Sequence, residues 1–249
     1  MNAPAHASYS FLLFSVICIL LFGSVPAGGP CAMAITAGLF PDIDGIFWIV
    51  KHGKGQTSTN FQHHLMYPTH WPVTYIPVVI WTAIAVVFNI FPTHFLALTI
   101  GIYSHLGCDT ISAGDGINWG APWSHHFVNL LASRTDGYHG LYWSARYRKT
   151  IFFKAGNVAA VGSMVLLAWF ALLDGHDVAW NIAGIIVLAI TVVASFHHID
   201  PKYEQEPPEG RYADYRAIPE YNSRLSPAMK NRVAEWKETH GDSGTGETK

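Results

Sequence analysis

Long apolar stretches alternate with short polar segments through the first 200 residues. Six stretches stand out, at 9–25, 27–40, 72–91, 93–108, 151–173 and 177–196. A helix needs about 20 apolar residues to cross the hydrocarbon core of a bilayer, and the third, fifth and sixth stretches reach that length. The second and fourth are short, so each is expected to continue as a helix into the polar residues that follow or to cross only part of the bilayer. The pattern predicts an all-α, multi-pass transmembrane helical bundle.

The pattern changes near residue 200, which divides the chain into a transmembrane domain (1–200) and a cytoplasmic tail (201–249). Residues 204–210, EQEPPEG, are typical of a linker because they are rich in helix breakers. Residues 226–240 are expected to form a short amphipathic helix, since Met229, Val233 and Trp236 would share one stripe. The final polar residues are expected to be disordered.

Composition supports a membrane protein. Half of the residues are hydrophobic and 13% are charged, whereas about 25% of a soluble domain is charged. No basic stripe indicates nucleic-acid binding. The odd number of cysteines, three, all within apolar stretches, does not indicate a disulfide framework.

Lys and Arg residues predict the orientation in the membrane. They occur in segments 51–71 and 109–150 and in the tail, but not in the connections 24–30, 91–93 and 174–177. Cytoplasmic loops carry the excess of Lys and Arg, so six crossings would place both termini in the cytoplasm. No positive charge precedes the first stretch, so a helix is expected there rather than a cleaved signal peptide.

Histidine and aspartate gather at the edges of the apolar stretches on the predicted cytoplasmic side. Ionisable groups are costly in a bilayer, so such groups are functional candidates, and His and Asp are ligands of divalent metals. The candidate metal ligands are Asp42, Asp44, His64, His70, His105, Asp109 and, with weaker support, His6.

The spacing within the motifs supports a shared site. His105 and Asp109 lie four residues apart and would project from one face of a helix, although such a pair could also only stabilise the helix. Asp42 and Asp44 would share a face in extended structure, and two close carboxylates repel each other unless a cation or a proton lies between them. The glycine-rich run at 110–123 is expected to fold back over the site.

These motifs resemble those of a bacterial inner-membrane family, the membrane-bound metal-dependent hydrolases, also described as LexA-binding, inner-membrane-associated hydrolases. The resemblance covers about residues 1–125. It rests on LFPDID, on GIYSHLGCD with the following WGAPW, and on a histidine segment that ends in TH. It implies a metal site and a distant similarity to zinc-dependent phospholipase C.

The family motifs carry over onto Phe40 to Asp44 and onto Gly101, Ser104, His105 and Asp109, with His6 as the early histidine. The middle motif departs from the family pattern. The family usually has His-Arg-Gly-x-Thr-His-Ser, whereas this chain has HLMYPTHW from His64 to Trp71. Both outer histidines remain, but the arginine is absent and Trp71 replaces the serine. An anion-binding role for that arginine is therefore not expected here.

The predicted function is metal-dependent hydrolysis of an ester or phosphoester, with a membrane lipid as a candidate substrate. Asp42, Asp44 or Asp109 would act as general base. Zinc is the expected metal, and manganese and iron also suit His and carboxylate ligands. The candidate ligands would suffice for two metals. Two alternatives stay open: a non-enzymatic membrane scaffold with a structural metal, and a metal or proton transporter.

Overall fold

The computed structural model describes residues 2–52, 67–111, 116–124, 128, 130, 144–145, 147–174 and 177–199. Seven α-helices are described in these ranges: α1 (Ala3–Phe22), α2 (Gly28–Ala37), α3 (Ile43–His52), α5 (Ile76–Phe88), α6 (Pro92–Ile111), α8 (Ile151–Asp174) and α9 (Val178–Ser195). Three short 3-10 turns accompany them: η1 (Phe40–Asp42), η2 (Pro68–His70) and η3 (Pro72–Tyr75). Within the described ranges, β pairing is limited to one antiparallel bridge between Ile117 and Val128. The predicted all-α fold class is confirmed for this part of the chain. The tail prediction for 201–249 lies outside it.

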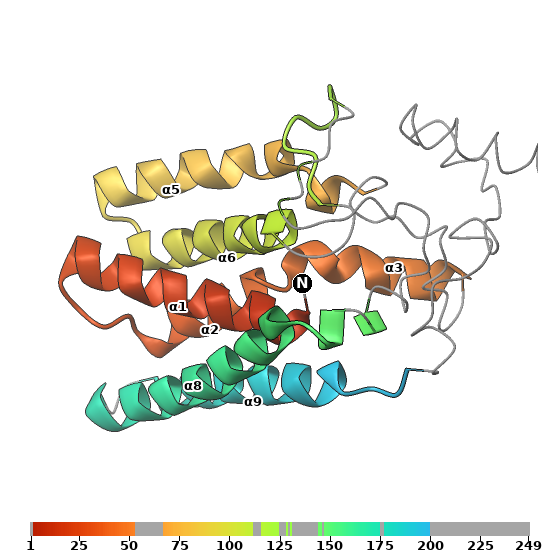
Figure 1. Cartoon of the computed structure of the whole chain (residues 1–249). Helices are drawn as coiled ribbons and strands as arrows, with labels where there is room; N and C mark the ends of the chain where they lie inside the picture. Colours follow the sequence, from red (N-terminus) through yellow and green to blue (C-terminus); the bar gives the residue numbers. More distant parts are fainter. Residues whose placement is uncertain are drawn as a thin grey trace, which may run out of the picture.

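Six helices lie side by side and alternate in direction, with α3 extending beyond them (Figure 1). One end of the bundle, called here the site end, holds the start of α1. There the Tyr147 hydroxyl, just before α8, lies 3.4 Å from Asn2 Oδ1. At the same end Ser195 of α9 donates to Asn157 of α8. The opposite end, called here the turn end, holds the short connections that follow α1, α5 and α8.

Three of the helices are long and apolar enough to cross a membrane by length and composition: α1, residues 151–173 of α8, and α9. The stretch at 72–91, predicted to be a full span, forms a shorter helix of 13 residues after a 3-10 turn. Pro72 and Pro77 lack backbone N–H donors and are tolerated only in the first turn of a helix, so α5 begins no earlier than Ile76, with Pro77 in its first turn. Asn89, in the left-handed region at φ 54°, ends the helix.

Helix α2 has only ten residues and packs between α1, α6 and α9. Small residues allow this close packing. A Cβ added at Gly101 would lie 2.5 Å from Ala37 Cβ, and one added at Gly38 would lie 2.9 Å from the His6 carbonyl oxygen. Small residues at helix interfaces let backbones approach closely in membrane proteins. The two glycines therefore bring α1, α2 and α6 together near the site end.

The core and the outer surface of the bundle are both apolar. Phe11, Phe14, Ile35, Leu167 and Leu188 are fully buried in one cluster that joins α1, α2, α8 and α9. Outward-facing positions of α8 and α9 also carry large apolar side chains, among them Leu172 and Val193. An apolar exterior over long helices suits contact with lipid rather than with water.

Candidate metal centre

Helix α1 carries the first candidate ligand. The helix begins at Ala3, after Asn2 as N-cap, six residues earlier than the apolar stretch suggested. His6 therefore lies within the helix, and its side chain is 1% exposed. Burial raises the pKa of the Tyr147 phenol, so its hydroxyl remains a donor toward Asn2 at the start of this helix. The position of His6 therefore depends on the packing of the first turn of α1 against the region of Tyr147.

A break between α2 and α3 carries the two acids of the PDID motif. Helix α2 ends at Ala37, η1 follows at Phe40–Asp42, and α3 starts at Ile43. The extended geometry considered for Asp42 and Asp44 does not occur, because Pro41 starts a 3-10 turn that leads directly into the helix. Asp44 instead lies in the first turn of α3, where the helix dipole favours a negative charge.

At this break, the backbone carbonyl of Gly38 accepts a hydrogen bond from a side chain. His105 Nδ1 lies 2.7 Å from the carbonyl oxygen of Gly38. A carbonyl oxygen only accepts, so Nδ1 carries the proton and donates. In a neutral imidazole, Nε2 then presents a lone pair, which is the form that binds a metal. The α2–α3 break thus fixes both the orientation and the tautomer of His105.

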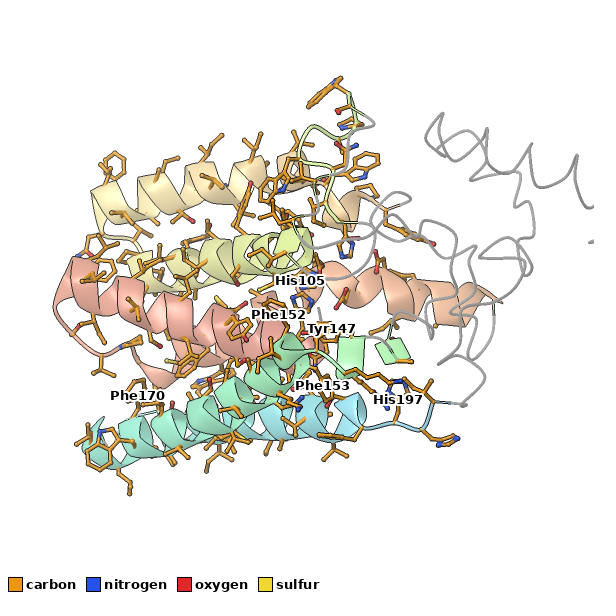
Figure 2. All side chains as sticks on the ribbon, in the orientation of Figure 1. His105, Tyr147, Phe152, Phe153, Phe170 and His197 are labelled. Atoms are coloured by element: carbon orange, nitrogen blue, oxygen red, sulfur yellow. The ribbon has the colours of Figure 1, made fainter. Side chains whose placement is uncertain are left out.

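Helix α6 supplies the pair predicted from its spacing. His105 and Asp109 face the same direction, and His105 Nε2 lies 3.0 Å from Asp109 Oδ2. The other oxygen, Asp109 Oδ1, lies 3.2 Å from His6 Nε2. The rings of His6 and His105 stack with centroids 3.8 Å apart. One carboxylate therefore connects the histidines of α1 and α6, and Figure 2 shows His105 at the site end of α6.

His70, in η2, lies in the same cluster as His105 and Asp109. Its Nε2 lies 3.5 Å from Asp42 Oδ1, and the same Asp42 oxygen lies 3.6 Å from His105 Nε2. Its other ring nitrogen, Nδ1, lies 3.0 Å from Asp44 Oδ2. Thr69 Oγ1 donates to that Asp44 oxygen at 2.9 Å, and the Tyr75 hydroxyl donates to the Thr69 carbonyl.

Asp44 consequently lies behind His70, on the side away from His105. Because a carboxylate accepts, His70 Nδ1 is the donor, and Nε2 is directed toward Asp42. A histidine that ligates a metal commonly donates its other N–H to a carboxylate in this way. This geometry makes Asp44 a residue that orients His70.

The remaining acceptor atoms are close enough to share one ion. Two ligand groups have atoms that all lie within 4.8 Å of one another: His6, Asp42 and His105, and His70, His105 and Asp109. The chemistry fits a divalent cation, because His105 Nε2 is fully buried, has no hydrogen-bond donor among the residues that the structure describes, and faces two carboxylate oxygens. Acceptors in such proximity repel one another unless a cation or a proton lies between them.

Both groups use His105, and this limits the number of ions that they can hold. Since Nδ1 is engaged by Gly38, His105 offers only Nε2. A lone pair binds one metal, so the two groups describe alternative ligands around a single position. The described residues therefore fit one metal on His105 better than the two metals that the ligand count alone would allow.

Access to the centre is asymmetric. His6, Asp44, His70, His105 and Asp109 are at most 2% exposed, whereas the side chain of Asp42 is 37% exposed. Asp42 is thus the member of the cluster that water or a substrate would meet first.

Other histidines, among them the predicted ligand His64, are placed apart from the centre or lie outside the described ranges. His64, His125 and His126 fall outside them. His197 lies exposed after α9, with Arg148 Nη2 3.1 Å from its Nδ1 (Figure 2). Part of the glycine-rich run does return to α6, since Trp119 donates to Thr110 next to Asp109 and Ile117 packs with Leu106 and Ala37.

Sequence reasoning missed the groups that hold the ligands in place. Ser10 of α1 donates to the His6 carbonyl at 2.7 Å, and its oxygen lies 2.5 Å from Ser104 Oγ of α6. The Gly38 carbonyl and Thr69 were missed as well. In the sequence, Thr69 directly precedes His70, whereas Ser10 and Gly38 each lie four residues from the nearest candidate ligand.

Comparison with known proteins gives one family. No curated protein and no solved structure matches this chain significantly. A family model described as YdjM inner membrane protein matches residues 1–197, which include every helix in the described ranges and all seven candidate ligands. The expectation of an inner-membrane protein is thereby confirmed: this chain belongs to the YdjM inner membrane protein family.

Proposed function

We propose that this inner-membrane protein binds one divalent metal at the site end of its bundle and uses it to hydrolyse an ester or phosphoester. The observation that carries the proposal is the environment of His105. Its Nε2 lone pair is buried and faces oxygens of Asp109 and Asp42 at 3.0 and 3.6 Å. Zinc suits this donor set of imidazole nitrogens and carboxylate oxygens, as do manganese and iron.

The ligands would come from four separate parts of the chain. His105 and Asp109 of α6 would bind the metal together with His70 of η2, and His6 of α1 or Asp42 of η1 would complete the site. Asp44 would hold His70 in place through its Nδ1 proton. When bound, a divalent metal lowers the pKa of a coordinated water to about 7 and stabilises charge on the oxygens of the scissile group.

Asp42 is the best candidate for the proton-transfer residue. A general base must reach both the nucleophile and the site where a proton is released, and Asp42 is both within the cluster and partly exposed. Its carboxylate would take the proton of the attacking water and later give it to the leaving oxygen. Asp44 and Asp109 are buried and already face histidines, which suits orientation and ligation.

The placement in the membrane is part of the proposal. Six helices, α1, α2, α5, α6, α8 and α9, would lie within the bilayer, with both termini and the site end at the cytoplasmic face. Supporting this orientation, the described basic residues, which are Lys51, Arg148, Lys149 and Lys154, lie at the same end as the candidate ligands, and the sequence has no Lys or Arg in the connections at the turn end.

A scaffold with a structural metal is the second candidate, because five of the six described ligand candidates are almost fully buried. Structural zinc sites have all positions filled by protein ligands. A transporter is less well supported, since the described His and Asp candidates gather at one end instead of along the bundle.

The experiment is an assay of purified protein in detergent on a panel of phosphodiesters, phosphomonoesters, carboxylic esters and glycerophospholipids. Turnover should disappear with chelator and return with one divalent ion. Asp42→Asn should lower kcat much more than metal content, since an amide can coordinate but cannot take a proton. Asp177→Asn, an exposed change at the turn end, is the matched control. Bound metal without chelator-sensitive turnover on the whole panel would favour the scaffold.

A further inference from the structure

Helix α3 carries large apolar side chains that are exposed beside the candidate metal centre. Ile46, Phe47 and Val50 are 61%, 60% and 80% exposed, and their spacing places them on one side of the helix. Asp44, on the same helix, is fully buried against His70. Phe40, two residues before Asp42, is 47% exposed. A group of large apolar side chains therefore flanks Asp42, the accessible residue of the site.

This surface joins the outer surface of the bundle. The Phe40 ring makes an edge contact with Tyr75, with centroids 6.5 Å apart. Tyr75 directly precedes α5, whose outward side chains include the exposed Ile76 and Ile80. Exposed apolar side chains of α5 and α3 thus lie on either side of the contact between Phe40 and the buried Tyr75. Apolar side chains beside a lipid-facing helix are expected to contact the same solvent.

The positions of Asp42 and Phe47 along the axis of the bundle support contact between α3 and lipid. Helix α6 has 20 residues, which is about 30 Å and equals the thickness of the hydrocarbon core. His105 lies six residues before the end of α6, about 9 Å inside that boundary. Asp42 is in contact with His105, and α3 leads from there past the end of α6 (Figure 1). Phe47, five residues after Asp42, would therefore lie about at the boundary.

The apolar face of α3 leads from Asp42 outward to about the depth at which one class of amphiphile carries its ester groups. In a bilayer lipid, the ester and phosphoester groups lie where the hydrocarbon core meets the polar headgroups. We propose that acyl chains of the bilayer cover Phe40 and the apolar face of α3, and that a lipid ester or phosphoester reaches Asp42 laterally along this face. The substrate class rests on the proposed hydrolase function, but the contact of α3 with lipid does not.

The first experiment tests the contact alone. A benzophenone amino acid replaces Phe47 in the full-length protein. The variant is reconstituted in vesicles of phosphatidylethanolamine and phosphatidylglycerol that contain a trace of alkyne-tailed phosphatidylcholine, and is then irradiated. Phe88, exposed at the turn end of α5, serves as the lipid-facing control, and Lys149, exposed before α8, as the polar control. Cross-linking at Phe47 should equal that at Phe88 and exceed that at Lys149 several-fold. Cross-linking no greater than at Lys149 would overturn the proposal.

The second experiment tests the substrate route. Phe47→Asp should raise KM for a long-chain fluorogenic glycerophospholipid about tenfold, because the acyl chain loses an apolar contact. It should leave kcat for that lipid and both constants for bis-p-nitrophenyl phosphate unchanged, because a water-soluble ester does not need the face. Equal effects on both substrates, or none, would overturn lateral entry. If neither substrate is hydrolysed, the hydrolase proposal fails while the cross-linking result still decides where α3 lies.

Discussion

The role expected of Asp44 from the sequence differs from the role that its contacts in the structure support. In the sequence it is one of two acids in PDID and is equivalent to Asp42 as a possible ligand. In the structure its Oδ2 lies 3.0 Å from His70 Nδ1 and accepts from Thr69. Asp42, in contrast, faces the Nε2 atoms of both His70 and His105. The two acids are thus expected to respond differently to the same substitution.

Asp44→Asn should weaken metal binding about 10- to 100-fold, because the neutral amide accepts the His70 Nδ1 proton less strongly than the carboxylate and can also donate to Nδ1, which favours the wrong tautomer. The affinity can be measured by competition with a chromophoric chelator in detergent. Asp177→Asn should have no effect. An Asp44→Asn protein that binds metal as tightly as the unaltered protein would contradict the orienting role.

The candidate ligands could be singled out in the sequence because ionisable residues are costly inside a bilayer. His105 and Asp109 could even be paired from their spacing. The tautomer of His105 could not be predicted from the sequence, because it depends on the carbonyl of Gly38, 67 residues earlier. Backbone carbonyls leave no signature in a sequence, so the most informative contact of the site required the fold.

At the scale of elements, the interruption of one helix organises the centre. Helix α2, the 3-10 turn at Phe40–Asp42 and α3 follow one another directly, and the break exposes a carbonyl while it directs two acids inward. Irregular backbone within a membrane is tolerated where it is buried in protein or lines a cavity. For the short apolar stretch at 27–40, the sequence left open a partial helix or a helix that continues into the polar residues, and the structure has a helix that ends at Ala37.

Close packing of α2 against α6 should be sensitive to one methyl group. Gly101→Ala would place a Cβ 2.5 Å from Ala37 Cβ and 2.8 Å from the Ala34 carbonyl oxygen. We expect a loss of about 1–3 kcal/mol in stability, as for overpacking in a core, and weaker metal binding because His105 shifts with α6. Thermal unfolding in detergent measures the first effect.

Gly107→Ala is the matched control on the same helix. No atom lies within 4 Å of a Cβ at this position, so the change should be neutral or stabilise the helix by up to about 1 kcal/mol. Equal destabilisation by both substitutions would show that the loss arises from α6 itself and not from its contact with α2.

For the whole molecule, the proposed orientation in the membrane rests on charge and on the arrangement of the helices. The alternation of directions brings residues 6, 42, 70, 105 and 109 to one end, although they are far apart in the sequence. The charge pattern alone had placed these residues on one side. Which helices cross fully could not be read from apolar length, because prolines shorten α5 and packing against glycines allows a ten-residue α2.

Reporter fusions test the orientation. A reporter after residue 92 or at residue 175 should be active only outside the cytoplasm, and one after residue 215 only inside it, because Lys and Arg favour the cytoplasmic side. An external reporter at residue 215 would invert the topology and place the metal centre at the periplasmic face.

The metal content of the purified protein tests the central claim most directly. Elemental analysis of protein purified without chelator should give about one divalent metal per chain, the number that a single His105 Nε2 can anchor. His105→Ala and Asp109→Ala should each lose that metal while still inserting into the membrane, and Asp177→Asn should retain it. An unaltered metal content in both His105→Ala and Asp109→Ala, or no metal in the unaltered protein, would contradict the account.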